Sequence, residues 1–365
     1  MTWTPTDHDL ARWRLRTQAL VAPYAATADA VVGGLLAVQA ENPAQSAWAV
    51  ACRTRAPDPT DLSDLLDEGR VVRTHVLRPT WHYVRAEDIG WLLELTAPRV
   101  RRTTGLQLRT SGFDDAAQAA LAAAVHHTLA HSPDLTRDEL AQALGGAGHD
   151  LGGHELMLLL ADLELQRLVV SGRPRDGVHT YALFDDRVPD PRRIDRDDAL
   201  AELVRRYLTG HGPATAADLA YWATLTVGDV RRGLEAVQHE LASFEHDGRT
   251  YWHAPDQEPP APGPGDPSAH LLQILDEIYR GYQDSRMVLD GEGVVPRGRE
   301  TSAGMALVDG QLVATMKRIV APRLVRFVLT PYGGRSLNAV ERNALEEAAA
   351  RYGAFLGVEA EIIVG

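Results

Sequence analysis

Apolar residues recur every three or four positions in several parts of the chain, the spacing that places side chains on one face of a helix. In the N-terminal region this pattern predicts helices near 6–20, 27–40 and 44–53. The second predicted helix carries a stripe formed by Val31, Val32, Leu35, Leu36 and Gln39. The stripe therefore ends in an amide, and the carboxylate of Glu41 follows two residues later.

Two later segments repeat one order of patterns. In both 134–184 and 212–255, a capping Thr precedes a short apolar helix, a turn leads to a second helix, and a β-period follows. The β-periods contain the turn dipeptides Asp176-Gly177 and Asp247-Gly248, which predict hairpins. A helix-turn-helix followed by a hairpin is the plan of a winged helix. The N-terminal region fits the same plan more loosely, with 70–86 as its β-pair. The alternative is a generic helical protein with a few hairpins.

The C-terminal part has a different pattern. After a segment rich in Pro and Gly, a β-period with a turn at Asp309-Gly310 precedes an amphipathic helix over 337–356 and a strand over 358–364. We therefore predict a mainly helical α+β protein, with three tandem winged-helix modules and a C-terminal α+β domain. The predicted boundaries are 1–112, 113–193 and 194–255 for the modules, 256–269 for a linker or loop, and 270–365 for the C-terminal domain.

Composition places the chain among globular proteins, with 45% hydrophobic and 24% charged residues. It contains no apolar run of about 18 residues, so we expect no transmembrane helix. The N-terminus lacks the pattern of a secretory signal. Cys52 is the only cysteine, which excludes an internal disulfide and fits a reducing cytoplasm. We expect a cytoplasmic monomer.

The charge is distributed unevenly. A net charge of −13 disfavours nonspecific binding to DNA. Residues 70–112, however, hold eight arginines against three acidic residues, a local charge of +5, and residues 311–336 hold five basic residues and no acidic one. Two such stretches could form one positive face, and the alternative is ordinary local variation. The candidates for phosphate contacts are Arg78, Arg99, Arg101, Arg102, Arg109, Lys317, Arg318 and Arg323.

Motifs of several common enzyme classes are missing. The sequence has no CxxC pair and no HExxH, so we predict no metal site. The glycine-rich stretch 144–153 lacks the GK[ST] of a phosphate loop, and no GxSxG occurs. We therefore expect no cofactor and none of the conventional hydrolase or nucleotide chemistry.

Gln39 and Glu41 would point to different faces if one helix held both. They converge only if the helix ends between them, and Asn42-Pro43 favours such an end because Pro disfavours helical geometry in the residue before it. The simpler interpretation, which spacing alone favours, is a solvated Glu41 and a Gln39 that caps a fraying helix.

Several longer motifs together favour a functional role for Gln39 and Glu41 over this simpler interpretation. The chain resembles the AlkZ/AlkX-like family of bacterial DNA glycosylases, which consist of tandem winged helices, and the similarity covers nearly the whole sequence. The motifs that carry it are LLAVQAE (35–41), RPTWHYVRAEDIGWLLELTAPRV (78–100), SGRPRDGVHTYALFDDRVP (171–189), GPATAADLAYWATLT (212–226), HLLQILDEIYRGYQDS (270–285) and ALEEAAARYGAFLGV (344–358).

The resemblance implies that Gln39 and Glu41 are catalytic. The family motif is Gln, an apolar residue, then Gln or Asp, so Glu41 departs from it by one methylene while keeping a carboxylate. A carboxylate beside C1′ can stabilise an oxocarbenium-like sugar and deprotonate water. The amide of Gln39 can hold that water with one donor and one acceptor. The implied reaction is hydrolysis of the glycosidic bond of N7-alkylated guanine, including bulky adducts, in base excision repair or in self-resistance to a DNA-alkylating natural product.

Trp81, His82 and Tyr83 form a second candidate wall of the site. His82 could orient water or contact a phosphate, and Trp81 or Tyr83 could stack on a base. Alternation along a strand sends His82 to the face opposite the other two, so the three cannot line one pocket. A purely structural His82 is an equal alternative. The segment 276–286 is expected to form an interdomain or DNA-facing surface, with packing as the alternative.

The expected partner is double-stranded DNA that carries alkylated bases. Two other functions stay open: a noncatalytic DNA-binding regulator or lesion sensor on the same scaffold, and winged helices that contact proteins. A pure DNA binder gains nothing from a carboxylate directed at phosphates, so Glu41 favours the enzyme. Binding that weakens steeply with salt would disfavour the protein-contact function.

Overall fold

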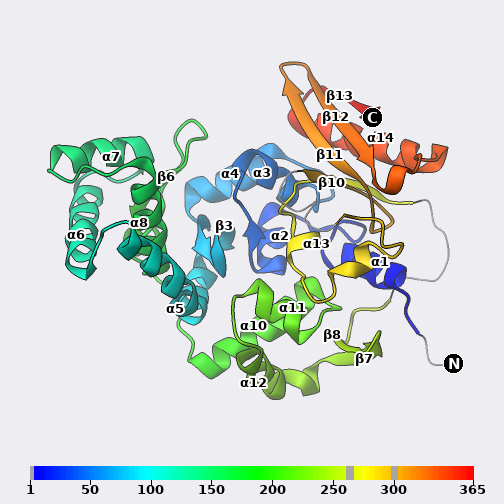
Figure 1. Cartoon of the computed structure of the whole chain (residues 1–365), viewed down its shortest axis with the longest axis horizontal. Helices are drawn as coiled ribbons and strands as arrows, with labels where there is room; N and C mark the ends of the chain where they lie inside the picture. The colour runs from blue at the N-terminus through cyan, green and yellow to red at the C-terminus, as the bar shows by residue number, and fades with distance from the viewer. Residues whose placement is uncertain (1–3, 260–266, 297–302) are drawn as a thin grey trace.

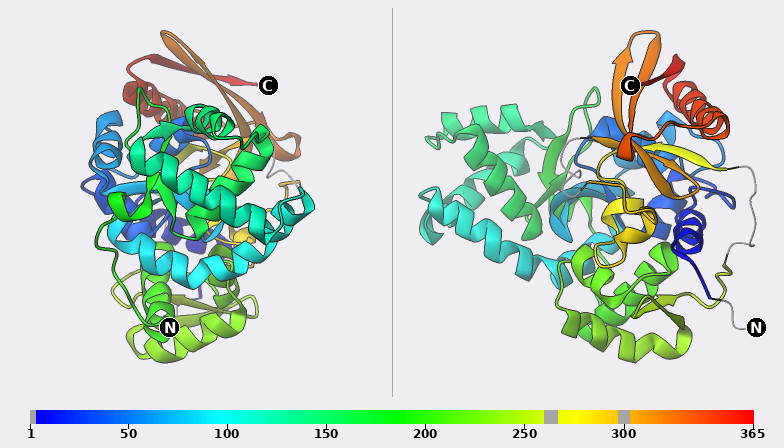
Figure 2. Two further views of the ribbon diagram at one scale, coloured as in Figure 1. Left: turned by 90° about the vertical axis from the view of Figure 1, so that its left-hand side faces the viewer. Right: turned by 45° about the vertical axis from the view of Figure 1, so that its right-hand side comes forward.

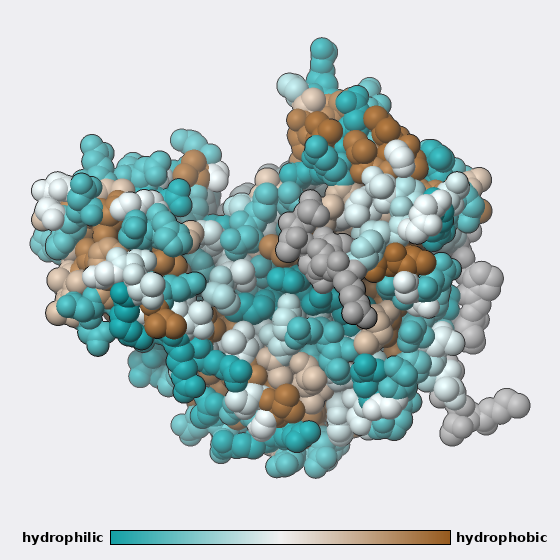
Figure 3. Space-filling view, viewed as in Figure 1, coloured by the Kyte–Doolittle hydropathy of each residue, from teal (hydrophilic) through white to brown (hydrophobic). Residues whose placement is uncertain are grey.

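The computed structural model describes residues 4–259, 267–296 and 303–365 (Figure 1). It is a mixed α and β structure in which helices α6, α7 and α8 form a lobe at one side. The C-terminal strands lie at the other side, and α10, α11 and α12 lie below (Figure 1). Space-filling atoms show the surface hollowed between the α6–α8 lobe and the C-terminal strands (Figure 3).

The first folded unit has the order helix, strand, two helices and a hairpin. Its strands pair in the order β1-β3-β2, so the first strand adds to the outer side of the hairpin. Helix α1 (Asp7–Thr17) precedes the unit and the 25-residue helix α5 (Ala86–Thr110) follows it. The unit consists of α2 (Ala28–Leu35), β1 (Val38–Gln39), α3 (Pro43–Ala51), α4 (Pro59–Glu68), β2 (Val71–Val76) and β3 (Arg78–Arg85).

The same order of elements occurs twice more in the described part of the chain. The second unit pairs its strands in the order β4-β6-β5, and in the third an isolated bridge between Ala214 and Trp252 stands in place of the first strand. The second unit consists of α6 (Asp115–His131), β4 (Leu135–Thr136), α7 (Arg137–Gly146), α8 (Gly153–Leu165), β5 (Val169–Ser171) and β6 (Thr180–Leu183), with α9 (Phe184–Arg187) after it. The third consists of α10 (Arg196–His211), α11 (Ala216–Trp222), α12 (Val227–Val237), the 3-10 turn η1 (Gln238–Glu240), β7 (Ala242–His246) and β8 (Arg249–His253).

The C-terminal part is a five-stranded sheet in the order β13-β12-β11-β10-β9. Its last strand is parallel to β12, whereas the other neighbours are antiparallel. The long hairpin of β11 and β12 projects beyond the rest of the molecule (Figure 2). The elements are β9 (Ala269–Leu272), α13 (Glu277–Arg280), η2 (Arg286–Leu289), β10 (Gly304–Val308), β11 (Gln311–Ala321), β12 (Leu324–Pro331), η4 (Tyr332–Gly334), α14 (Ala339–Leu356) and β13 (Glu359–Val364).

Local sequence signals account for many element ends. Thr136 and Thr215 cap α7 and α11 with reciprocal hydrogen bonds to an acidic residue three positions on. The dipeptides at 176–177, 247–248 and 309–310 all take positive φ, as their turns require. The predicted hairpins and the predicted C-terminal helix are therefore confirmed. Part of the predicted linker, residues 260–266, lies outside the described residues.

The helix predicted over 27–40 is wrong at its C-terminal end. Helix α2 stops at Leu35 because Leu36 has φ of +65°, and Gln39 lies in β1, paired with His82 of β3. A periodic apolar stripe thus continues in sequence while the backbone changes from helix to strand. Gln39 therefore lies in a strand, and Glu41 follows that strand and not a helix end.

The buried residues form separate hydrophobic cores. Some of these cores join different units, and one lies mainly within a single unit. One core joins the hairpin of the first unit to α5 and to α10–α12, and another joins α1 and α3 to the C-terminal sheet. The second unit has its own core, formed mainly by leucines of α6, α7 and α8. Within the described ranges, no helix is long and apolar enough to cross a bilayer.

Candidate active site

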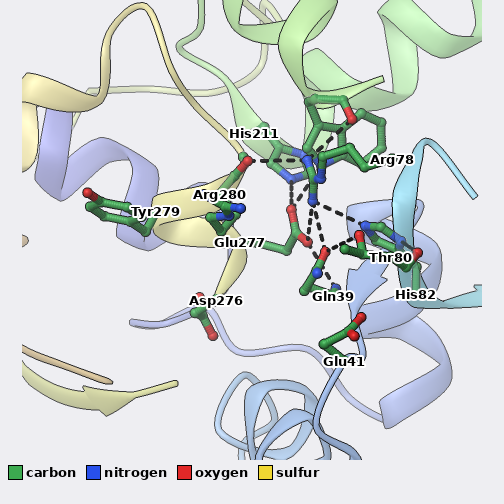
Figure 4. A network of polar contacts seen from close by, with 12 residues as sticks. Gln39, Glu41, Arg78, Thr80, His82, His211, Asp276, Glu277, Tyr279 and Arg280 are labelled. Atoms are coloured by element: carbon green, nitrogen blue, oxygen red, sulfur yellow. Dashed lines mark hydrogen bonds and ion pairs between the residues drawn. The ribbon is translucent and has the colours of Figure 1, made fainter. Parts of the chain in front are cut away.

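Gln39 is held at the centre of a buried polar network (Figure 4). Only 1% of the residue is exposed, and its backbone N–H donates to Glu277 Oε1 at 3.0 Å. Its backbone carbonyl accepts from Gln273 Nε2 at 3.4 Å. Gln39 thus connects β1 of the first unit with the segment that follows β9, more than 230 residues later in the chain.

Arg78 fixes the side chain of Gln39. Its Nη2 donates to Gln39 Oε1 at 3.0 Å, and the hydroxyl of Thr80 donates to the same oxygen at 3.4 Å. A guanidinium has only donors, so the atom that faces it must be the amide oxygen. With its acceptor engaged in this way, the side chain of Gln39 presents its Nε2 hydrogens as donors.

The prediction that Arg78 contacts DNA phosphates is wrong. The residue is 7% exposed and also donates to the backbone carbonyls of Trp222 and Arg280, at 3.2 and 3.3 Å. Burial is the main cause that lowers its pKa, while the nearby Glu277 carboxylate opposes this effect. Arg78 therefore joins three parts of the fold around Gln39.

His82 is completely buried on the same face of the small sheet as Gln39. Burial and the charge of Arg78 lower its pKa to about 3, so the ring is neutral at physiological pH. Its Nδ1 lies 2.9 Å from the carbonyl oxygen of Thr80 and is thereby the protonated nitrogen. Its Nε2 then accepts from Arg78 Nη2 at 3.1 Å. A phosphate cannot reach this buried ring, and the contacts of both its nitrogens favour the structural alternative for His82.

Glu277 is a buried contact of Gln39 that the sequence alone did not single out. It is 0% exposed, and besides Gln39 it accepts from Trp222 Nε1 at 2.9 Å. Its Oε2 lies 3.5 Å from His211 Nε2, and Arg78 lies 3.9 Å from Oε1. Burial by itself would raise its pKa, but the contact with His211 and the charge of Arg78 lower the pKa to about 2. The sequence signal that could have pointed to Glu277 was the acidic pair 276–277, which interrupts a short apolar run.

A second buried ion pair fixes the segment that carries Glu277. Arg53 at the end of α3 binds Asp276 through both terminal nitrogens, at 2.7 and 3.1 Å. Gln18 accepts from Arg53 at 3.0 Å and donates to the backbone carbonyl of Glu277 at 3.3 Å. Asp276, Glu277, Tyr279 and Tyr282 are all buried, so this part of the predicted 276–286 surface is packed inside the protein.

Glu41 lies outside this network and is exposed (Figure 4). One carboxylate oxygen accepts from the backbone N–H of Trp81 at 3.3 Å. Arg73 donates to the backbone carbonyls of Ala40 and Glu41, at 2.9 and 3.4 Å, which holds the turn between β1 and α3. Asn42 then caps α3. The motif therefore combines a buried, clamped amide with an accessible carboxylate two residues later.

Trp81 and Tyr83 lie on the opposite face of the sheet from His82, as alternation predicted. Arg73 lies over the ring of Trp81, 4.3 Å from its centroid, and His75 packs against the ring at 4.5 Å. Tyr83 is 2% exposed and pairs with Arg73 across the strands. Tyr83 is thus too buried to stack on a base in this conformation.

The remaining basic candidates lie on two separate elements. Arg99, Arg101, Arg102 and Arg109 are exposed on α5, although Arg101 pairs with Asp162 and Arg109 with Asp115. Lys317 and Arg323 are exposed on the β11–β12 hairpin, and Arg318 is half-buried against the hydroxyl of Tyr352. Figure 1 places α5 and the hairpin on different sides of α2 and α3.

Within residues 4–259, 267–296 and 303–365, no three His, Cys, Asp or Glu side chains are arranged to hold a metal ion. The available groups are an accessible carboxylate, a donor amide fixed by buried charges, and arginines on nearby elements. Such a set can stabilise positive charge on a substrate and activate water, without a covalent nucleophile.

Comparisons with known proteins agree with the family predicted from the motifs. A family model described as DNA glycosylase AlkZ-like matches residues 32–355. The interstrand DNA cross-link repair glycosylase of Streptomyces sahachiroi is 25% identical over 363 residues, which cover 93% of this chain and 94% of the relative. The solved structure of the Streptomyces sahachiroi DNA glycosylase AlkZ shares the fold, with a TM-score of 0.77, 22% identity, and coverage of 99% of this chain and 100% of that one. Because the family model spans most of the sequence, this chain belongs to the AlkZ-like family of DNA glycosylases, enzymes that hydrolyse the bond between a base and its deoxyribose.

Proposed function

We propose that this enzyme is a monofunctional glycosylase that releases N7-alkylated guanine, including bulky adducts, from double-stranded DNA. The observation that carries the proposal is the pairing of an exposed carboxylate, Glu41, with an amide, Gln39, that is fixed from two sides by Arg78 and Glu277. A relative is named for repair of interstrand DNA cross-links. We extend the proposal to such cross-links when they are attached at N7.

Glu41 acts as the base in this mechanism. Loss of the purine leaves positive charge at C1′, which the carboxylate stabilises while it takes a proton from the attacking water. Gln39 donates an Nε2 hydrogen to the oxygen of that water, because its own carbonyl is engaged by Arg78 and Thr80. The water therefore accepts from Gln39 and donates to Glu41, which changes the donor-and-acceptor role expected for Gln39 from the sequence.

The substrate supplies the other half of the chemistry. A guanine alkylated at N7 carries a positive charge, so it departs as a neutral base and needs no general acid. His82, which pairs with Gln39 across the strands, is neutral and buried and does not serve as one. The proposed site is therefore complete with one carboxylate and one amide.

We further propose that the three repeated units are winged-helix modules, over 1–112, 113–193 and 194–255, and that 270–365 is a C-terminal domain. The order helix, strand, two helices and hairpin supports this interpretation. DNA would lie in the hollow between the second unit and the β11–β12 hairpin (Figure 3), with exposed arginines of α5 and the cations of the hairpin on phosphates. A hollow of this kind suits bulky lesions that are not fully flipped from the duplex.

The test is release of free modified base from duplex DNA that contains one 7-methylguanine or one bulky N7 adduct. We expect Glu41→Gln to slow release about 100- to 1,000-fold while DNA binding is retained. The matched control is Glu68→Gln, an exposed carboxylate on α4 of the same unit, which should release base at the wild-type rate.

The other outcomes discriminate the alternatives. Release that is unaffected by Glu41→Gln would leave the enzyme and discard Glu41 as its base. No release of any N7 adduct by the wild-type protein, with tight binding to the same DNA, would discard the proposed substrate class and favour a lesion-binding protein.

A further inference from the structure

A pocket of about 610 Å³ opens next to the proposed catalytic residues, between the first and second units. One wall is formed by α3 and α4, and the facing wall by the β5–β6 hairpin, including Pro174 and Gly177. The proposed reaction at C1′ does not itself use this space. Its volume is within the range of about 300–1,000 Å³ that is typical of small-molecule sites.

The helical walls are largely apolar. On α4, Pro59, Leu62, Ser63 and Leu66 line the pocket, and their spacing of three and four residues places them on one face of the helix. The acidic Asp67 of α4 lines it as well. On α3, Pro43, Ala44 and Ala47 line it. Small and apolar residues on two adjacent helices leave room for a large apolar group and offer it few competing hydrogen bonds.

The pocket begins where the catalytic motif ends. Asn42 and Pro43, the two residues after Glu41, belong to its lining. So does Arg73, whose side chain donates to the backbone carbonyls of Ala40 and Glu41. A group held at Glu41 would therefore have the pocket directly beside it.

One polar atom on the hairpin side is buried without a partner among the described residues. His179 lines the pocket, and its Nε2 is buried without a hydrogen-bond partner among the described residues. Burial lowers the pKa of His179 to about 3, so the ring is neutral. Unpaired buried polar atoms are rare in folded proteins, because each one loses its hydrogen bond to water.

We propose that this pocket receives the apolar alkyl or aryl substituent carried on N7 of the guanine adduct. The inference rests on the proposed function. C1′ is bonded to N9, and N7 lies one carbon away from N9 in the same five-membered ring. When Glu41 faces C1′, the N7 substituent is therefore about one ring's width away, where the pocket opens. A methyl group leaves the pocket almost empty, whereas a bulky apolar group fills it and is recognised there.

The test compares two probes in otherwise identical duplexes, 7-methylguanine and 7-(2-naphthylmethyl)guanine, with spontaneous depurination subtracted. Ser63→Trp places an indole in the pocket from α4. Asp64→Trp is the matched control, because Asp64 is also exposed on α4 but does not line the pocket. We expect Ser63→Trp to lower naphthylmethyl release about 10-fold or more. Release of 7-methylguanine should stay near wild type, which also shows that the variant is folded and its catalytic centre intact. Asp64→Trp should leave both rates unchanged.

A second blocking variant, Ala44→Phe, approaches from α3 and should give the same selectivity. The inference is overturned if either folded variant lowers the release of both probes equally, or lowers the release of neither probe. In both cases the pocket does not recognise the N7 substituent. If the wild-type enzyme releases neither probe, the proposed function itself fails. The measurement on the wild-type enzyme thus distinguishes failure of the pocket inference from failure of the proposed function.

Discussion

Replacement of Glu277 by Gln tests whether the buried charges position Gln39. In the wild-type protein, Oε1 accepts from the backbone of Gln39 and Oε2 accepts from Trp222, at 3.0 and 2.9 Å. An amide has only one oxygen, so one of these donors would face an NH₂ group. The substitution also leaves the buried guanidinium of Arg78 without its nearest negative charge. The shape of the side chain is conserved, so the effect is electrostatic.

The magnitude follows from the pKa of Glu277, which falls from its ordinary value of 4.5 to about 2. At about 1.4 kcal/mol for each pKa unit, the charged form stabilises the fold by about 3 kcal/mol. Because the folded-state pKa is lowered, this contribution is complete above pH 4.5 and is lost as the pH falls toward 2. At pH 3 about 1.4 kcal/mol would remain.

The assay is urea unfolding followed by circular dichroism. We expect Glu277→Gln to lower the free energy of unfolding by about 3 kcal/mol at pH 7 and by less than half of that at pH 3. At about 2.1 cal/mol/K for each of 365 residues, the same loss corresponds to a fall in Tm of about 4 °C. Base release should also slow, because a neutral amide replaces the carboxylate that holds the Gln39 backbone N–H and faces Arg78.

The matched control is Glu347→Gln, a change of charge on the exposed surface of α14, which should leave stability within about 0.5 kcal/mol of wild type. The reasoning is refuted if Glu277→Gln is as stable as wild type at pH 7. It is also refuted if the loss of stability is the same at pH 7 and pH 3, since the loss would then not come from the charge.

Three further predictions follow from the same structure. Asp276→Asn should destabilise the fold by about 3–5 kcal/mol, measured by urea unfolding, because it leaves Arg53 buried without its counter-charge, and equal stability would contradict this role. Lys317→Ala combined with Arg323→Ala should reduce by about 2 the slope of log affinity against log salt for duplex DNA, and an unchanged slope would remove the hairpin from the proposed interface. Cys52, whose pKa is raised to about 12 by burial, should react with iodoacetamide at pH 8 only as fast as the protein unfolds, and rapid labelling of the native protein would contradict its burial.

Several features of this protein were determined by short-range sequence. Thr136 and Thr215 begin helices because their hydroxyls cap free backbone N–H groups locally. The Asp-Gly pairs make turns because those residues tolerate positive φ. Alternation along β3 placed His82 opposite Trp81, as predicted from the strand pattern alone. Each of these outcomes depends on neighbours within a few residues, which the sequence lists directly.

The candidate site was determined only in part by local sequence. The motif pointed to Gln39 and Glu41, but the helix expected to hold Gln39 ended early, and pairing with β3 placed Val38 and Gln39 in a strand. Tertiary structure also decided which arginines are free. Arg78 belongs to the same basic stretch, 70–112, as the exposed arginines of α5. It is nevertheless enclosed by the first unit, the third unit and the segment after β9.

Glu277 shows most directly why local sequence does not reveal the tertiary contacts of the site. It meets Gln39 across 238 positions of sequence and Trp222 across 55, and nothing in its own neighbourhood names either partner. Local propensity records what a residue favours beside its neighbours, whereas burial and charge pairing depend on which distant surfaces the fold brings together. The sequence by itself therefore determined the secondary structure signals, the family and the two motif residues. Only the tertiary structure decided that the amide is buried and clamped, and that the carboxylate is left open to solvent beside an apolar pocket.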